Sequence, residues 1–167
     1  MSSDTIDAQQ RFDVIDVYNN YALGIDTKNW PLVRSCFTDE VLIDYGEISA
    51  ATGSADVPRK AEDWLAHIKG VINGFDQTRH AITNHRFHKD GDAIVCAACL
   101  RADHIIFSNP EHGIAGTDDI VTIVGKYTNT CLLTEDGWKV SKSRLEVNWS
   151  SGNAALFPQA MQRAATA

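Results

Sequence analysis

Two side chains of this sequence, the carboxylate of Asp26 and the imidazole of His80, have the clearest potential for acid–base chemistry. Asp26 follows Tyr18 by eight residues on a predicted helix, so it shares the face that carries apolar side chains. A buried charge without a partner is costly, which indicates that Asp26 has one. A carboxylate beside His80 would fix the histidine tautomer and stabilise its protonated form, making it a better general base. We predict that the two meet in a cavity; the alternative is that Asp26 caps the turn before Trp30 and His80 is half exposed.

Three further side chains are candidates for the same site. His104 lies late in a long predicted strand, where a lone histidine is more often a surface residue than a functional one. Tyr45 ends an apolar strand and is more often a core residue whose hydroxyl is satisfied. Tyr21 is equally ambiguous. The residue types alone therefore leave a structural and a functional interpretation open for each of them.

The six histidines raise the question of a metal site. Strand alternation places His80 on one face with Ile82 and Asn84, and His85 on the other. Because His80, His85 and His88 do not share one strand face, we predict no metal site. No motif indicates a Ser or Cys nucleophile triad, a phosphate-binding glycine loop or a dinucleotide fold.

The elements that must position these side chains are helices first and long strands afterwards. The first helix has an apolar face of Phe12, Ile15, Tyr18, Ala22 and Ile25. Helices are predicted at 8–27, 30–36 and 59–75, and strands at 41–45, 78–88, 92–107, 118–133 and 138–149, with hairpin turns at 89–92 and 135–137. This order indicates an α+β fold, in which N-terminal helices pack on a curved antiparallel or mixed sheet that encloses a pocket. The apolar tail 154–158 either covers the mouth of that pocket or joins a subunit contact.

Length and composition narrow the class of protein. The chain has 167 residues, 44% hydrophobic and 22% charged, and no linker or repeat divides it, so we expect a single domain over 1–167. A net charge of −7 argues against a nucleic-acid partner. No apolar run is long enough for a membrane span, and the N-terminus lacks the features of a secretory signal, so we expect a cytoplasmic protein.

The four cysteines are predicted to be buried free thiols. Cys96 and Cys99 have the C-x-x-C spacing of some redox and zinc sites. They lie in a strand-like run, where positions three apart face opposite sides, and no helix follows at once. Buried thiols behave as small hydrophobes, and this is the interpretation that we favour for all four.

Several short motifs together resemble scytalone dehydratase, an enzyme of the SnoaL-like group in the nuclear-transport-factor-2-like (NTF2-like) superfamily. They are the segments 25–30, 41–45, 77–80, 100–104 and 136–140, and Trp149. The resemblance covers nearly the whole chain. It implies a cone-shaped α+β barrel, usually trimeric, that works without a cofactor.

The resemblance also implies site residues. Asp26 and His80 match the family's Asp–His dyad, which the hexachlorocyclohexane dehydrochlorinase and bile-acid dehydratase branches share in similar form. His104 matches a second pocket histidine, and Tyr45 matches a tyrosine that helps to hold a water against the substrate carbonyl. Tyr21 occupies the place of a pocket lysine or tyrosine of other branches.

Other positions depart from the scytalone dehydratase pattern. Ile25 stands where that enzyme has its other water-holding tyrosine, and Lys126 and Thr128 stand near its pocket serine and asparagine. Ser143 falls where the dehydrochlorinase has a functional arginine, and Arg144 is next to it on the opposite strand face unless a bulge intervenes. The predicted substrate-binding residues are Ile25, Trp64, Lys126, Thr128 and Phe157.

The hypothesis that follows is a cofactor-independent lyase, most simply a dehydratase that eliminates water from a small cyclic hydroxy-carbonyl compound by Asp–His acid–base catalysis. The same dyad would also serve an isomerase or a cyclase. A third interpretation is a non-catalytic small-molecule-binding protein. The expected partners are a small-molecule substrate and further copies of the chain, with a trimer favoured over a dimer.

Overall fold

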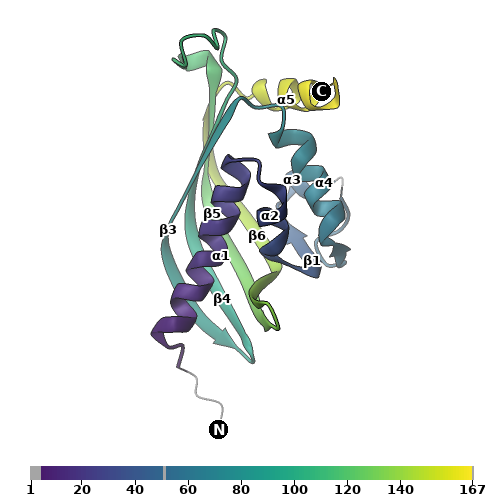
Figure 1. The fold of residues 1–167 in the computed structure, drawn as a ribbon, viewed down its shortest axis with the longest axis vertical. Coiled ribbons are helices and arrows are strands. Elements are labelled where there is room, and N and C mark those ends of the chain that lie inside the picture. The colour runs from purple at the N-terminus through teal and green to yellow at the C-terminus, as the bar shows by residue number, and fades with distance from the viewer. Residues whose placement is uncertain (1–4, 51, 167) are drawn as a thin grey trace.

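The computed structural model describes residues 5–50 and 52–166. Figure 1 shows helices on one side of a long, bent sheet, with the C-terminal helix across one end. The helices are α1 (Ala8–Asp26), α2 (Trp30–Ser35), α3 (Glu47–Ala50), α4 (Ala61–Ile72), the 3-10 helix η1 (Thr117–Asp119) and α5 (Leu156–Thr166). The strands are β1 (Phe37–Asp44), β2 (Arg59–Lys60), β3 (Gln77–Asp90), β4 (Ala93–Ile105), β5 (Ile120–Thr134) and β6 (Gly137–Gly152).

The sheet has six strands in the order β2-β1-β6-β5-β4-β3. All neighbours are antiparallel except β1 and β6, which pair in parallel, so the sheet is mixed. Strands of 13 to 16 residues cannot stay flat in a small protein, and the sheet bends around the helices without closing on itself (Figure 1). The predicted α+β class, with N-terminal helices on a curved mixed sheet, is confirmed.

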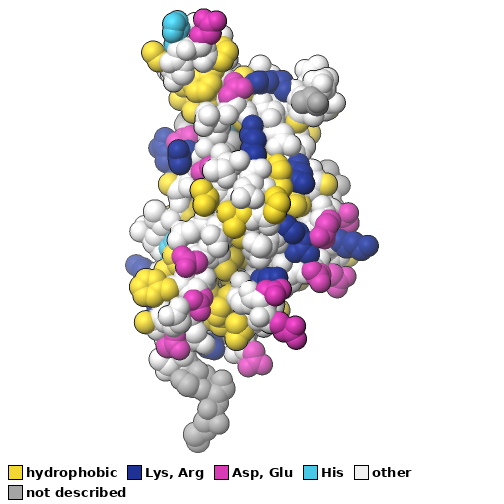
Figure 2. Space-filling model, viewed as in Figure 1, with side chains coloured by type: hydrophobic (Ala, Val, Ile, Leu, Met, Phe, Trp, Pro, Cys, Tyr) yellow, Lys and Arg dark blue, Asp and Glu magenta, His cyan; other side chains and the backbone are white. Residues whose placement is uncertain are grey.

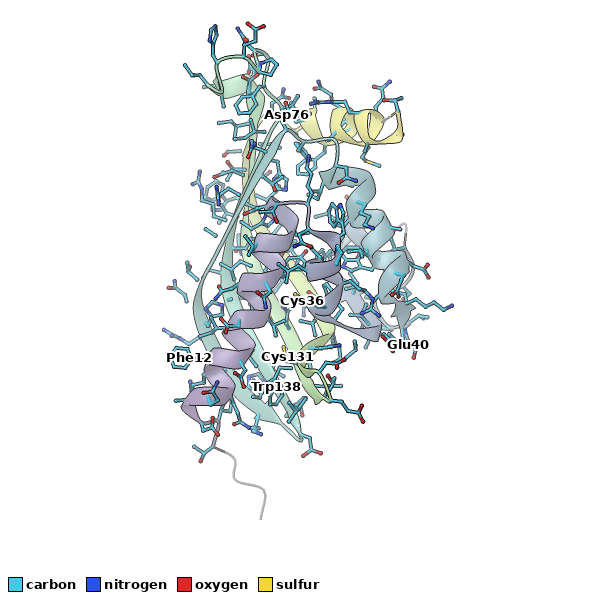
Figure 3. All side chains as sticks on the ribbon, in the orientation of Figure 1. Phe12, Cys36, Glu40, Asp76, Cys131 and Trp138 are labelled. Carbon is cyan, nitrogen blue, oxygen red and sulfur yellow. The ribbon has the colours of Figure 1, made fainter. Side chains whose placement is uncertain are left out.

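The first helix begins with a capping box and buries one narrow face. The Asp7 side chain accepts from the backbone N–H of Gln10, and the Gln10 side chain accepts from that of Asp7. Its buried residues are Val14, Val17, Tyr18, Gly24 and Ile25. The predicted face was wrong at Phe12, which is 64% exposed and points away from the sheet (Figure 3). Six residues span 600°, so Phe12 lies about a third of a turn away from Tyr18.

A close approach between α1 and α2 sets the end of the first helix. A Cβ at Gly24 would lie 2.6 Å from Cγ2 of Val33, so a larger residue at Gly24 would push α2 away. Asn29 caps α2 by accepting from the backbone N–H of Leu32. The tight packing leaves Asp26, the last residue of α1, beside the beginning of β3.

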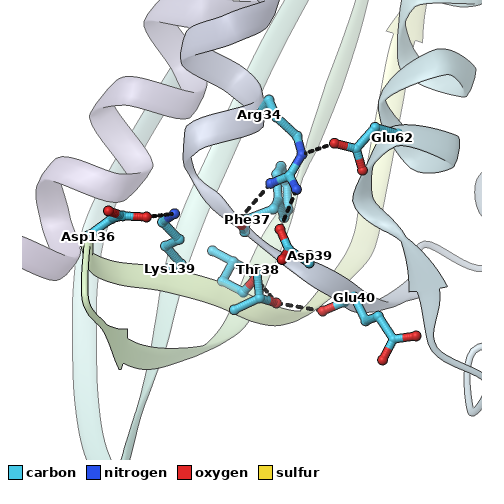
Figure 4. A network of polar contacts seen from close by, with 9 residues as sticks. Arg34, Phe37, Thr38, Asp39, Glu40, Glu62, Asp136 and Lys139 are labelled. Carbon is cyan, nitrogen blue, oxygen red and sulfur yellow. Dashed lines mark hydrogen bonds and ion pairs between the residues drawn. The ribbon is translucent and has the colours of Figure 1, made fainter.

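Arg34 joins α2 to the start of α4 and to β1 (Figure 4). Its Nε lies 2.6 Å from the Glu62 carboxylate, its second guanidinium nitrogen lies 2.7 Å from that of Asp39, and it also donates to the carbonyl of Phe37. Burial opposes the charge of Arg34, but these acceptors outweigh burial and raise its pKa. The network fixes the first turn of α4, which carries Trp64.

A bulge in β3 changes which residues face the helices. Asn84 has a positive φ of 58°, and the pairing with β4 shifts register between Thr83 and Arg86. His80 therefore faces inward before the bulge, and His85 faces inward after it. The prediction that His85 lies on the opposite face from His80 was wrong, because strict alternation counts no extra residue.

The tail folds as the helix α5, which lies against the end of α4 (Figure 1). A Cβ at Gly74 would lie 1.8 Å from the carbonyl oxygen of Ala160, so only glycine permits this contact. Arg163 on α5 lies 2.7 Å from Asp76, in the link to β3 (Figure 3). Phe157 thereby reaches the cavity wall.

The remaining expectations concern thiols, surface charge and membrane spans. Cys36, Cys96 and Cys131 are buried free thiols, but Cys99 is exposed because it points out of the opposite face of β4. Figure 2 shows acidic and basic side chains interspersed over the face that carries α1, α2 and α4. Among the described residues, no helix has the length and apolar character needed to cross a membrane.

Candidate active site

Asp26 and His80 form a hydrogen-bonded pair at the junction of α1 and β3. Oδ1 of Asp26 lies 2.7 Å from Nδ1 of His80, and Oδ2 accepts from the backbone N–H of His80 at 2.9 Å. The Thr78 hydroxyl donates to Oδ1 at 2.9 Å. The sequence predicted this meeting, and the alternative in which Asp26 caps the turn before Trp30 is wrong.

The charge state of Asp26 determines the tautomer of His80. Burial opposes ionisation of Asp26, but the hydrogen bonds from the His80 ring, the His80 backbone and Thr78 outweigh it, and the pKa of Asp26 is lowered. An ionised carboxylate can only accept, so Nδ1 of His80 must donate to it. In the neutral imidazole the lone pair is then on Nε2, the nitrogen that can take a proton from a ligand.

His80 lies on the wall of a cavity of about 110 Å³ between the sheet and α4. An engineered apolar cavity of about 150 Å³ holds benzene, so this space is of the order of one six-membered ring. Its walls combine aromatic and aliphatic side chains with a few polar groups; they include Tyr21, Tyr45, Trp64, His67, Leu100, His104, Ile123, Tyr127, Leu145 and Phe157.

His104 points into this cavity from β4 and is buried and neutral. Its ring centroid lies 5.5 Å from that of His80 and 5.1 Å from those of Phe75 and Phe157. Burial, with a smaller contribution from the nearby His80, lowers the pKa of His104 to about 4. Nδ1 of His104 is buried and has no hydrogen-bond partner among the described residues. A ligand in the cavity could satisfy that nitrogen.

Three tyrosines form a second polar region of the cavity wall. The ring of Tyr127 lies 6.1 Å from that of Tyr21 and 5.9 Å from that of Tyr45, centroid to centroid. The Tyr45 hydroxyl lies 2.9 Å from Oγ of Ser143, whose hydroxyl donates to Oδ1 of Asn129 at 2.7 Å. Burial is the main cause that raises the pKa of each tyrosine, so all three hydroxyls stay protonated.

The structure separates the predicted substrate-binding residues. Trp64 and Phe157 line the cavity, whereas Ile25 is buried in the core and is not part of the cavity wall. Lys126 and Thr128 point out of the opposite face of β5, where Lys126 pairs with Glu146 at 2.9 Å. The prediction at these two positions was wrong by one residue.

Their neighbours Tyr127 and Asn129 face inward on β5, and the sequence prediction missed both. They share the parity of the buried Val121 and Cys131, so the apolar alternation of this strand could have located them. On β6, Ser143 faces inward and is buried, while Arg144 lies on the outer face, 3.6 Å from Asp44. Of the two, Ser143 is therefore on the inner face of the sheet, where it lies behind Tyr45 and not on the cavity wall itself.

The donor set does not resemble a metal centre. Within the described part of the chain, no group of three or more His, Cys, Asp or Glu side chains could hold a metal ion. The polar residues around the cavity are instead three histidines, three tyrosines and Trp64, whose indole N–H is buried without a partner in the described structure. This arrangement suits proton transfer and hydrogen bonding to a neutral ring.

A model of the SnoaL-like domain matches residues 7–144. The chain belongs to the SnoaL-like domain family, within the NTF2-like superfamily. Among solved structures, this SnoaL-like chain is similar to the Kfla4162 protein from Kribbella flavida, with 30% identity and a TM-score of 0.75 over 91% of this chain and 99% of that one. The comparison with curated proteins found no match.

Two more distant structures share the SnoaL-like fold. One is the "Putative Scytalone Dehydratase" from Novosphingobium aromaticivorans, at 12% identity and a TM-score of 0.69 over 86% of this chain and 87% of that one. The other is a hexachlorocyclohexane dehydrochlorinase, at 19% identity and a TM-score of 0.68 over 87% of this chain and 90% of that one. At these identities the likeness concerns the fold alone.

Proposed function

We propose that this SnoaL-like protein is a cofactor-independent lyase that removes water from a single-ring hydroxy-carbonyl compound. The observation that carries the proposal is the contact of 2.7 Å between Asp26 and His80 at the wall of a ring-sized cavity. Two distant structural neighbours are named as a putative dehydratase and a dehydrochlorinase, and both names describe elimination reactions.

The reaction would begin at Nε2 of His80. This nitrogen takes the proton from the carbon next to the carbonyl, and the ionised Asp26 stabilises the imidazolium that forms. The developing enolate oxygen accepts a hydrogen bond from the cluster that Tyr21, Tyr45 and Tyr127 form on the cavity wall. The enolate then re-forms the carbonyl and expels the hydroxyl group, to which protonated His80 returns the proton, so that water leaves and the enzyme is regenerated.

His104 would orient the departing hydroxyl rather than protonate it. Its pKa of about 4 means that it is uncharged near neutral pH, and a neutral imidazole is a much weaker acid than the His80 imidazolium. Phe157, which packs against the His104 ring and lines the same cavity, would shield this side of the cavity from water.

The test is turnover of a panel of single-ring hydroxy-ketones by the wild type and by Asp26→Asn and His80→Ala. Loss of general base catalysis typically costs ~10²–10⁴-fold in rate, and we expect a loss of this size for each variant. The matched controls are Asp16→Asn, on the exposed side of α1, and His88→Ala, exposed on β3; both should keep wild-type rates. Unchanged turnover in Asp26→Asn and His80→Ala would show that the dyad is not catalytic.

An isomerase or cyclase would use the same first step and differ only in the fate of the enolate. Product analysis in heavy water separates the two, because a lyase product is lighter by one water, whereas an isomeric product carries deuterium at a new carbon. A non-catalytic binding protein does not require the hydrogen-bonded pair of Asp26 and His80 at the cavity wall. It is the outcome if no member of the panel is converted but ring compounds bind.

A further inference from the structure

A chain of three buried polar side chains runs behind the tyrosine cluster. Tyr45 follows β1, while Ser143 on β6 and Asn129 on β5 are direct partners in the sheet register. Tyr45, Ser143 and Asn129 are only 6%, 2% and 8% exposed. The distances are 2.9 Å from the Tyr45 hydroxyl to Oγ of Ser143, and 2.7 Å from that Oγ to Oδ1 of Asn129. In the described structure, none of these three side chains forms a hydrogen bond with Asp26 or His80.

The number of hydroxyl protons determines which group donates and which accepts along this chain of hydrogen bonds. A hydroxyl has one proton to donate, and the Ser143 proton is donated to the Asn129 carbonyl oxygen. Ser143 can therefore only accept from Tyr45 at the other contact. The Tyr45 proton is used in that bond, so the Tyr45 oxygen presents only lone pairs to its other neighbours.

This direction divides the tyrosine cluster into one acceptor and two donors. Burial raises the pKa of Tyr45, Tyr21 and Tyr127, so none of them provides a negative charge that would reverse the chain. Tyr21 and Tyr127 keep their protons available, and Tyr45 can accept from one of them. A phenolic hydrogen bond to an oxygen atom in the main cavity, which all three tyrosines line, must then come from Tyr21 or Tyr127.

We propose that Ser143, held by Asn129, is a positioning residue that directs the Tyr45 proton away from the cavity. The hydrogen bond to the substrate oxygen is then donated by Tyr127 or Tyr21 and not by Tyr45. The catalytic consequence rests on the proposed function, whereas the direction of the chain does not.

The direction is tested without a ligand, by NMR of the full chain with labelled tyrosine. We expect a slowly exchanging Tyr45 hydroxyl proton with a nuclear Overhauser contact to the Ser143 β-proton. Ser143→Ala should abolish this contact, and Ser143→Thr, which keeps the hydroxyl, should preserve an equivalent contact to the threonine side chain. The matched control is Ser141→Ala on the same strand, whose hydroxyl donates to the carbonyl of Thr130 and not to this chain.

The opposite arrangement has a distinct signature. If the Asn129 amide nitrogen donated to Ser143, every proton would turn towards the cavity, and the Tyr45 hydroxyl proton would contact Tyr127 or Tyr21 instead. That result, or a Tyr45 signal that Ser143→Ala leaves unchanged, would overturn the proposal.

The consequence for an anionic oxygen is tested with 4-nitrophenol, a single ring whose absorbance reports whether it is bound as phenol or phenolate. Ser143→Ala frees the Tyr45 proton, which can then turn to the bound oxygen. A hydrogen bond to a charged group is strong enough to change the bound phenolate-to-phenol ratio by about tenfold, so we expect a tenfold rise. Adding Tyr45→Phe to Ser143→Ala should return the ratio to the wild-type value.

If Ser143 only supported packing, Ser143→Ala would loosen the site, and a loosened site would not raise the ratio of bound phenolate to phenol. A ratio that falls or stays constant in Ser143→Ala would contradict the proposal, and a wild type that does not bind 4-nitrophenol would overturn its catalytic part. Failure of the dyad is recognised separately, by unchanged turnover in Asp26→Asn.

Discussion

At the scale of single residues, two side chains of the cavity wall, Trp64 and His104, each have a buried nitrogen without a partner among the described residues. The indole N–H of Trp64 is buried without a partner among the described residues, and its ring meets that of Tyr45 edge to face at 5.0 Å. A buried donor without an acceptor costs about 1–3 kcal/mol, so such a group is retained most simply because a ligand oxygen accepts from it.

Trp64→Phe separates this binding role from packing. Phenylalanine keeps an aromatic wall but removes the donor, so the gain from losing an unsatisfied N–H offsets part of the lost volume. We expect the free energy of unfolding to change by less than about 2 kcal/mol. Affinity for a single-ring ketone should fall about tenfold, while affinity for a hydrocarbon of the same ring size stays constant. Calorimetry with both ligands checks this, with Trp30→Phe on α2 as the control; an equal loss for both ligands would contradict a donor role.

At the scale of elements, α5 depends on a glycine at the end of α4. The carbonyl oxygen of Ala160 occupies the place where a side chain at residue 74 would be. The contact between Arg163 and Asp76 holds the same junction. Burial opposes the charge of Asp76, but Arg163 and the Phe107 N–H outweigh it and lower the pKa of Asp76. Together these contacts place Phe157 over His104.

Gly74→Ala should therefore detach α5 while leaving the sheet intact. The added Cβ would meet backbone at 1.8 Å, which cannot be relieved by a side-chain rotation. We expect rapid amide hydrogen exchange in α5 and access of solvent to His104. The matched control is Gly70→Ala, where no atom lies within 4 Å of the added Cβ; it should stabilise α4 by about 0.5–1 kcal/mol. If the α5 amides of Gly74→Ala stayed protected from exchange, the backbone at Ala160 would have moved to accommodate the added Cβ, and the prediction would be wrong.

The helices and strands also show which parts of the fold and of the site could be predicted from the sequence. The apolar repeat and the turn residues were sufficient for three helices and four long strands, whereas the helical position of Asp26 left two arrangements open, of which the structure has the one beside β3. The predictions failed at His85 and Lys126 for different reasons. On β5, Lys126 was assigned to the cavity from the family resemblance, although the strand's own alternation favours Tyr127. On β3, the bulge at Asn84 reversed the face of His85. Bulges depend on partner strands, so alternation along a single strand cannot reveal them.

At the scale of the whole molecule, the outer face of the sheet is the surface that we expect to join subunits. Trp149 is 52% exposed on β6 and is paired in register with Val124 on β5. We predict a homotrimer, with a mass by light scattering of three times the chain mass of 18.4 kDa. Trp149→Glu would place a charge in that contact and should yield monomers, whereas Phe12→Glu, on an exposed part of α1, should not. A wild-type mass equal to that of one chain would reject the assembly.

The stability of the whole molecule should depend on pH through its buried histidines. The pKa of His104 falls from 6.5 to about 4 on folding because burial disfavours its charged form. Between these values the unfolded chain binds a proton that the native protein does not, so stability is full above pH 6.5 and is lost as the pH falls. The full effect of such a shift is roughly 3 kcal/mol. Burial also lowers the pKa of His85, which adds to the loss in the same direction.

Asp26 also makes stability depend on pH, but at lower pH and as an acid whose charged form is favoured in the native protein. Its pKa is lowered from 3.8 by its hydrogen bonds, so its contribution is present above that value and is lost as the pH falls through the native pKa. Urea unfolding from pH 8 to pH 3 should therefore show a first decline between about 6.5 and 4, and a second decline below 3.8. His104→Phe should remove most of the first decline and leave the second, whereas His88→Ala on the exposed side of β3 should leave both. A first decline that persists unchanged in His104→Phe would mean that this imidazole is not held neutral by burial in the native protein.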